Sequence, residues 1–107
     1  MAYRYIWKIT VEESEVANFI LNWREGSKVL QEYSGALGTR LHKSIDEPNT
    51  YYAIAEWESK SARDDMEADR LAGSERGKRW EKYANHDSYG LPISVARLEE
   101  IEVVLPE

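Results

Sequence analysis

The sequence contains no cysteine among its 107 residues. Without thiols the chain cannot form disulfide bonds, use a thiolate nucleophile or bind a metal through cysteine. Long apolar runs are also missing, so no segment is long enough to span a membrane. The first residues, Met1 to Tyr5, lack the apolar centre of a secretory signal peptide. These absences predict a cytoplasmic protein without a membrane partner.

Basic residues are outnumbered, because 14 Lys and Arg stand against 20 Asp and Glu, for a formal net charge of −6. Nucleic-acid binding needs a basic surface that replaces phosphate counterions, so we expect no nucleic-acid partner. The composition, 42% hydrophobic and 32% charged, is that of an ordinary folded protein. The length predicts one domain over residues 1–107.

Phenylalanine is nearly absent, with a single residue, whereas there are four Trp and seven Tyr. Trp and Tyr suit places where one end of the ring is buried and the other meets a polar partner, such as a cavity or an interface. The simpler alternative is that these rings fill the core. Both interpretations stay open from composition alone.

A period of two predicts a first strand, and helical spacing predicts the helix that follows it. The apolar face of this strand consists of Tyr3, Tyr5, Trp7, Ile9 and Val11. Thr10 and Glu13 have the spacing of a capping box, so we expect the helix to begin there. An apolar stripe runs from Val16 to Leu30, and the helix should end near Tyr33.

Two more strands follow as an antiparallel hairpin. Residues 35–44 and 51–58 have strand patterns, and the turn residues 46–49 connect them. Ser59 is the expected N-cap of a second helix that extends to about Arg70. The acidic residues of this helix surround it rather than converge, so they are interpreted as a solvated face and not as a metal site.

The last part of the chain completes a familiar order of elements. A further helical piece carries Trp80 and Tyr83, and a final strand region runs from Ile93 to Leu105 with a bulge or bend near Glu99 and Glu100. The order β-α-β-β-α-β predicts a ferredoxin-like α+β fold with a four-stranded antiparallel sheet and helices on one face. The other face needs cover, which predicts a homodimer.

The segment from Gly35 to Ser59 resembles the antibiotic biosynthesis monooxygenase-like domains. Its second strand, Gly-Ala-Leu-Gly-Thr-Arg-Leu-His-Lys-Ser, begins with Gly, and its third strand ends in Trp57 shortly before the second helix. The resemblance spans roughly Tyr5 to Met66. It implies a homodimer whose two sheets pack face to face into a dimeric α/β barrel, with a pocket between the sheet and helices of each subunit.

The resemblance also implies two kinds of chemistry. Some members oxygenate polycyclic phenols or quinols without a metal, flavin or other cofactor, because the deprotonated substrate itself donates an electron to dioxygen. Others cleave haem with an Asn, a Trp and a His, and the matching positions here hold Trp7, Met66 and Arg76. Without that His the proximal iron ligand is missing, so haem chemistry ranks below the cofactor-free reaction.

The leading hypothesis is therefore a cofactor-independent monooxygenase acting on a small aromatic compound of the phenol or quinol type. Arg40 and His42 share a strand face, where Arg40 could stabilise a phenolate and His42 could accept its proton. The alternative for this pair is a place at a dimer interface or in solvent, and His86 is expected in a surface loop. The candidate pocket residues are Trp7, Tyr52, Trp57, Trp80 and Tyr83. The competing function is a non-catalytic ligand-binding or stress-response homodimer of the same fold.

Overall fold

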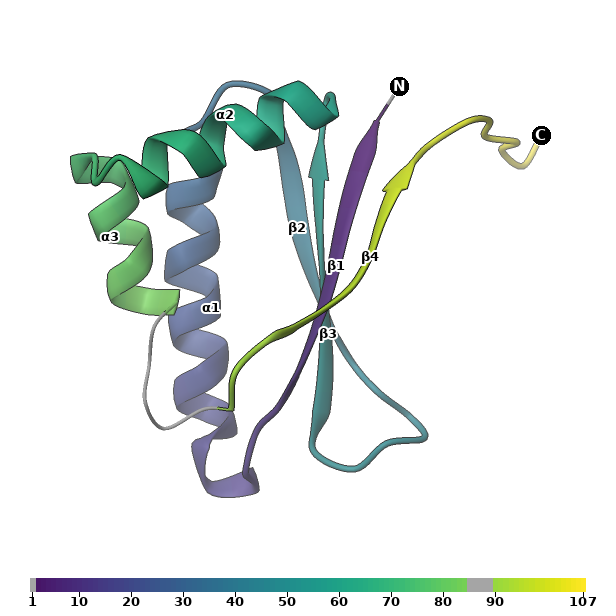
Figure 1. The fold of residues 1–107 in the computed structure, drawn as a ribbon. Helices are drawn as coiled ribbons and strands as arrows, with labels where there is room; N and C mark the ends of the chain where they lie inside the picture. Colours follow the sequence, from purple (N-terminus) through teal and green to yellow (C-terminus); the bar gives the residue numbers. More distant parts are fainter. Residues whose placement is uncertain (1, 85–89) are drawn as a thin grey trace.

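A four-stranded antiparallel sheet carries all the described helices on one of its faces (Figure 1). The computed structural model describes residues 2–84 and 90–107. The elements in chain order are β1 (Tyr3–Thr10), the 3-10 turn η1 (Glu13–Glu15), α1 (Val16–Leu30), β2 (Ala36–Lys43), β3 (Thr50–Trp57), α2 (Lys60–Leu71), α3 (Glu75–Ala84) and β4 (Ile93–Glu99). The sheet order β2-β3-β1-β4 confirms the α+β, ferredoxin-like fold.

The register of the sheet decides which side chains meet the helices. β1 pairs with β3 so that Tyr3 lies opposite Trp57 and Trp7 opposite Ala53. Side chains opposite each other in an antiparallel pair share a face. The buried hydrophobic residues of both strands, among them Ile9, have odd numbers. The odd positions of β1 and β3 therefore face the helices, and the even positions form the uncovered surface, which we call the open face.

The two helix starts differ in their capping. Ser59 caps α2 as the sequence predicts, because its Oγ accepts a 3.1 Å hydrogen bond from the backbone nitrogen of Ala62. The predicted capping box at Thr10 and Glu13 is wrong. Thr10 still belongs to β1, and α1 follows η1 with Glu15 at its N-cap and no side-chain cap bond.

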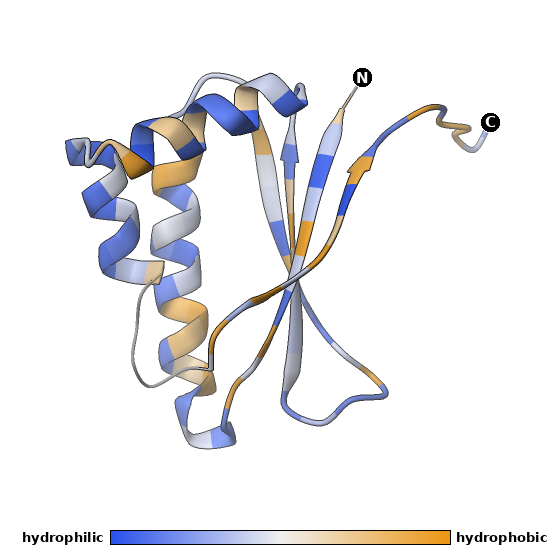
Figure 2. Ribbon diagram, viewed as in Figure 1, coloured by the Kyte–Doolittle hydropathy of each residue, from blue (hydrophilic) through white to orange (hydrophobic). Residues whose placement is uncertain are grey.

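The final strand is shorter than the sequence predicts. β4 ends at Glu99, which pairs with Tyr3 at the first residue of β1, and one more backbone hydrogen bond of 2.8 Å follows, from Glu100 to the carbonyl of Ala2. The irregularity lies earlier, where the register against β1 shifts between Ala96 and Ser94. Residues 101–107 extend away from the sheet and are largely apolar, with Ile101 85% exposed (Figures 1 and 2).

The core consists of two separate clusters between the sheet and the helices. One contains Tyr3, Tyr33, Trp57 and Met66. The other contains Ile9, Val11, Phe19 and Tyr51. Because each cluster uses one end of β1 and β3, the middle of the sheet is left for other contacts. Within the described part of the chain, no helix combines the length and apolar character needed to cross a membrane.

Candidate functional site

A cavity of about 370 Å³ lies between the middle of the sheet and the three helices. Mid-strand residues Trp7, Ala53 and Ala55 line one side, and residues of α1, α2 and α3 line the others. The cavity therefore lies between the two core clusters, at the level of the middle of the sheet. A space of this size and lining is typical of a site for a small organic molecule.

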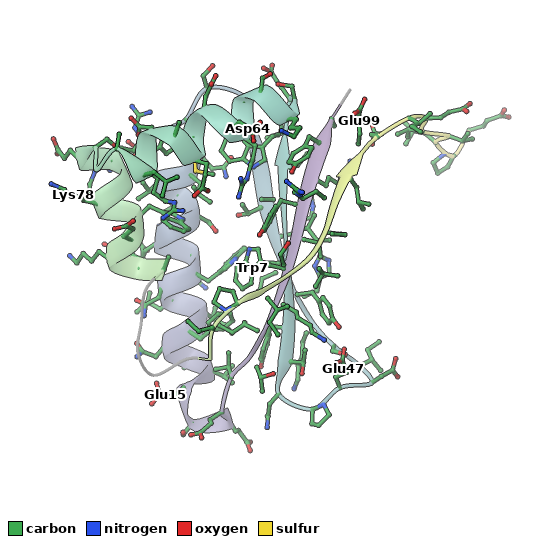
Figure 3. All side chains as sticks on the ribbon, viewed as in Figure 1. Trp7, Glu15, Glu47, Asp64, Lys78 and Glu99 are labelled. Atoms are coloured by element: carbon green, nitrogen blue, oxygen red, sulfur yellow. The ribbon has the colours of Figure 1, made fainter. Side chains whose placement is uncertain are left out.

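Aromatic rings from both the sheet and the helices line the cavity. All four tryptophans of the chain contribute, from four different elements: Trp7, Trp23, Trp57 and Trp80. Figure 3 shows Trp7 pointing from β1 toward α1. Tyr5, Phe19 and Tyr83 add further rings. Such a wall offers flat apolar surfaces against which another ring can stack.

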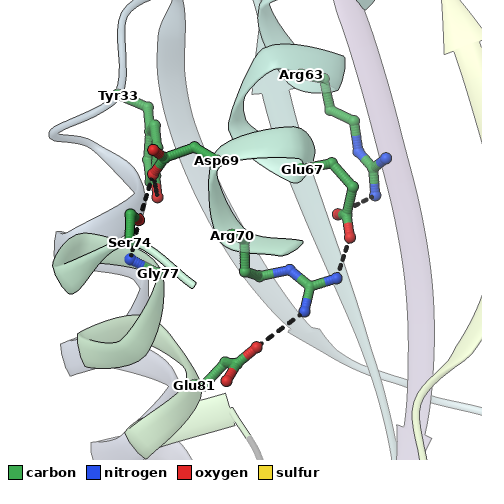
Figure 4. Close-up of polar contacts among 8 residues, drawn as sticks. All are labelled: Tyr33, Arg63, Glu67, Asp69, Arg70, Ser74, Gly77 and Glu81. Carbon is green, nitrogen blue, oxygen red and sulfur yellow. Dashed lines mark hydrogen bonds and ion pairs between the residues drawn. The ribbon is translucent and has the colours of Figure 1, made fainter. Parts of the chain in front are cut away.

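One patch of the wall is charged and belongs to α2. Arg63, Glu67 and Arg70 all line the cavity. Arg63 Nη2 lies 3.3 Å from Glu67 Oε2, and Arg70 Nη2 pairs with the other oxygen, Oε1 (Figure 4). Arg70 Nη1 also lies 3.2 Å from Oε1 of Glu81 on α3. The spacing i, i+4, i+7 places the three lining residues on one stripe of the helix.

Both arginines of this patch lie over aromatic rings of the wall. The guanidinium carbon of Arg63 is 4.7 Å from the ring centroid of Tyr5, and that of Arg70 is 5.1 Å from the ring of Trp80. These are distances at which a cation is attracted to the face of a ring. The rings thus hold both guanidinium groups in position at the cavity, together with the ion pairs to Glu67.

Close backbone packing and a polar network position α3, which brings Trp80 and Tyr83 to the cavity. A Cβ atom on Gly77 would lie 2.8 Å from the Cα of Arg70, so only glycine allows this approach of α3 to α2. Asp69 accepts hydrogen bonds of 2.6 Å from Tyr33 and from Ser74 (Figure 4). These bonds lower the pKa of Asp69, while burial and the bond to Asp69 raise the pKa of Tyr33.

The predicted site residues separate into two groups. Trp7, Trp57, Trp80 and Tyr83 line the cavity. Arg40, His42 and Tyr52 are absent from the described lining. The register explains their position, because His42 and Arg40 pair with the even positions 52 and 54 of β3 and so belong to the open face.

The polar residues of the open face pair with one another. The hydroxyl of Tyr52 donates a hydrogen bond to Glu47, which raises the pKa of that phenol. Arg40 Nη1 lies 4.0 Å from Glu56, and Glu56 also pairs with Arg4 at 3.2 Å. The sequence predicts Arg40, His42 and Tyr52 beside a bound substrate. They lie instead on the open face, outside the described lining of the cavity. His86 lies outside the described residues.

The charged patch was missed from the sequence because α2 was interpreted as a solvated acidic face. The available signal was the spacing of two arginines around one glutamate on the stripe next to Met66. Met66 itself is buried and lines the cavity, as does Trp7, whereas Arg76 lies over the ring of Tyr33 outside the described lining. None of the three offers the imidazole expected of the haem-cleaving branch.

Known structures share this fold over nearly the whole chain. A presumed antibiotic biosynthesis monooxygenase from Bordetella bronchiseptica has a TM-score of 0.74 at 22% identity, covering 94% of this chain and 98% of its own. A second presumed member, from Deinococcus radiodurans, has a TM-score of 0.71 at 9% identity, covering 100% and 99%. SnoaB from Streptomyces nogalater, a cofactor-independent oxygenase, has a TM-score of 0.63 at 17% identity, covering 99% and 98%.

These identities establish a common fold and no more. No curated protein matches the sequence. The family model described as antibiotic biosynthesis monooxygenase matches residues 2–68, from the first strand through most of α2. Because this match covers more than half of the sequence, the chain belongs to the antibiotic biosynthesis monooxygenase family.

Proposed function

We propose that this protein oxygenates a small aromatic compound of the phenol or hydroquinone type inside the cavity, without a metal or flavin. The observation that carries the proposal is the cavity wall, to which every tryptophan of the chain contributes. Membership of the family and the shared fold with a cofactor-independent oxygenase support the same reaction class. The aromatic wall would bind the faces of a substrate ring and exclude water.

The reaction balances with dioxygen as the only oxidant. For an anthrone-type phenol, the methylene carbon between the two rings becomes a carbonyl. One oxygen atom of O₂ ends in the new C=O bond, and the other leaves as water with both methylene hydrogens. The substrate supplies all four electrons, so no external reductant is needed. The protein holds the deprotonated ring system and dioxygen together in a dry site, which lowers the barrier through proximity.

Arg40 and His42, the catalytic pair predicted from the sequence, have no role in the proposed reaction. Arg40 and His42 belong to the open face, and a substrate in the cavity would be separated from them by the sheet. The groups that we assign to substrate binding are Trp7, Trp57, Trp80 and Tyr83. They come from two strands and one helix and meet around the same space.

Oxygen consumption with anthrone-type phenols and naphthohydroquinones tests the proposal. We expect the protein to accelerate uptake above the spontaneous rate and ¹⁸O₂ to place one labelled atom in the product. Ala55→Phe, which adds a ring inside the cavity, should abolish the acceleration. Leu71→Phe adds the same ring at a position that is 72% exposed and should change nothing. Tight ligand binding without turnover would instead support the non-catalytic binding protein.

We also propose that two copies associate through their open faces. Ile6 belongs to this face, and Leu98 of β4, which is 49% exposed, pairs with the even position Arg4. A monomer would leave these side chains in water, and burying them against a second sheet is favourable. The exposed apolar residues after β4 would gain cover from the same partner.

A further inference from the structure

The charge of the cavity wall is positive, although the protein as a whole is acidic. Arg63, Glu67 and Arg70 are the only charged residues in the lining that the structure describes, so the wall carries two positive charges and one negative. The two arginine side chains are only 19% and 22% exposed. Glu81, the second partner of Arg70, is 39% exposed and lies outside that lining.

Glu67 cannot neutralise both arginines. Its two oxygens are divided between them, Oε2 facing Arg63 and Oε1 facing Arg70 (Figure 4). Within the described lining, two guanidinium groups therefore face one carboxylate in a partly buried place, and Arg70 has its second partner, Glu81, outside that lining. Charged groups in such surroundings interact more strongly than they do in water, because screening by solvent is reduced. A negatively charged oxygen in the cavity would add a partner for Arg63 and for the buried Nε of Arg70, which has no hydrogen-bond partner among the described residues.

The same arrangement leaves no ready acceptor for a proton. Glu67 is the only carboxylate in the described lining, and no described histidine belongs to it. Accepting a proton from a ligand would cost Glu67 its ion pairs with Arg63 and Arg70. A ligand that already carries its negative charge avoids this cost. The patch is therefore built to receive an anion and not to create one.

We propose that the cavity selects aromatic compounds that carry an anionic oxygen, either a carboxylate or a phenol acidic enough to be ionised, and that Arg63 and Arg70 are the specificity-determining residues. The inference rests on the proposed function, since it names the substrate class of the same cavity. The aromatic wall takes the ring system, and the α2 patch takes the charged oxygen through charge-assisted hydrogen bonds. Stacking over Tyr5 or Trp80 fixes the plane of each guanidinium, and the buried Nε of Arg70 has no hydrogen-bond partner among the described residues.

Calorimetric titration with matched ligands tests this inference apart from catalysis. The set consists of 2-naphthoate, the neutral 2-naphthamide, 2-naphthol and a nitro-substituted naphthol that ionises near neutral pH. We expect 2-naphthoate to bind at least about tenfold more tightly than 2-naphthamide, which corresponds to about 1.4 kcal/mol. The pH series identifies the source of the anion. If phenolates are accepted, affinity for the nitronaphthol rises as it ionises, and affinity for the carboxylate stays constant over that range.

Arginine substitutions identify the patch. Arg63→Met and Arg70→Met should remove most of the preference for naphthoate and leave the affinity for naphthamide within about twofold. Arg79→Met is the matched control, because Arg79 pairs with Glu32 at an exposed position outside the described lining. It should leave both affinities unchanged.

The outcomes separate the two proposals. Equal binding of naphthoate and naphthamide would overturn the inference while leaving the aromatic cavity intact. A preference for naphthoate that survives both arginine substitutions would also overturn it. If none of the ligands binds, the cavity is not a ligand site, and the proposed function falls together with the inference.

Discussion

The hydroxyl of Tyr33 donates a 2.6 Å hydrogen bond to Oδ2 of Asp69, which joins the turn after α1 to the last turns of α2. The same oxygen accepts a 2.6 Å bond from Ser74, whose Oγ in turn accepts from the backbone nitrogen of Gly77 at the start of α3. One carboxylate oxygen therefore connects all three helices. The aromatic side of the cavity depends on this junction, because α3 carries Trp80 and Tyr83.

The first prediction concerns the stability of this junction in acid. Hydrogen bonds from Ser74 and Tyr33 lower the pKa of Asp69 below its usual 3.8. A depressed pKa means that the stabilisation is present above pH 3.8 and is lost as the pH falls through the lowered value. We expect Asp69→Asn to unfold more easily at pH 7 and to lose less stability than wild type on going from pH 5 to pH 2.

Urea unfolding at a series of pH values measures this difference. Asp65→Asn is the control, because Asp65 is an exposed carboxylate on the same helix. It should behave like wild type throughout. If the free energy of unfolding falls equally for wild type and Asp69→Asn between pH 5 and pH 2, this carboxylate does not contribute to the pH dependence.

The second prediction concerns the turn into β2. Gly35 has a φ of +84°, and a Cβ atom there would lie 2.5 Å from the Cβ of Ala62. Gly35→Ala should therefore destabilise the fold by roughly 2–4 kcal/mol, through a left-handed backbone and a clash with α2. Chemical denaturation gives the value.

Two further variants separate the contribution of the backbone from that of the clash in the destabilisation by Gly35→Ala. Gly38→Ala also has a positive φ, +111°, but its Cβ would meet nothing within 4 Å, so it should show the backbone cost alone. Adding Ala62→Gly to Gly35→Ala should recover part of the loss. No recovery in the double variant would contradict the close approach between the two residues.

The third prediction concerns Trp57, which is 2% exposed, belongs to the first core cluster and also lines the cavity. Trp57→Ala should cost about 3–5 kcal/mol, as expected for deleting a large buried ring. Trp80→Ala, which removes a less buried ring from the same cavity, should cost less stability and weaken aromatic ligands more. Equal losses of stability would contradict this division between core anchor and ligand contact.

The fourth prediction concerns association. Sedimentation equilibrium at micromolar concentration should show a dimer. Ile6→Arg, on the open face, should shift it toward monomer, because it places a charge inside the proposed contact. Leu71→Arg adds the same charge at an exposed position of α2 and should leave the dimer unchanged. A wild-type monomer at that concentration would contradict the proposed open-face contact.

Local patterns were enough to predict most elements of the fold. The alternation of Tyr3, Tyr5 and Trp7 identified β1, and Ser59 marked the start of α2 where its side chain does cap the helix. The capping box at Thr10 failed because pairing with β3 keeps Thr10 in the sheet. The end of β4 was misplaced for a related reason, since alternation continues to Leu105 although the ladder with β1 ends at Glu99 and Tyr3.

The residues of the candidate site could also be predicted only in part from local patterns. A period of two separates Trp7 from Lys8 and Leu41 from His42, but it is symmetric and does not say which face the helices will cover. Only the packing of α1, α2 and α3 on the odd positions of β1 and β3 placed Arg40 and His42 outside the cavity. The sequence by itself thus determined the order of elements, the family and the high content of Trp and Tyr. Tertiary structure decided that α2 presents Arg63 and Arg70 to a cavity, because a helix surface becomes a wall only when other elements enclose it.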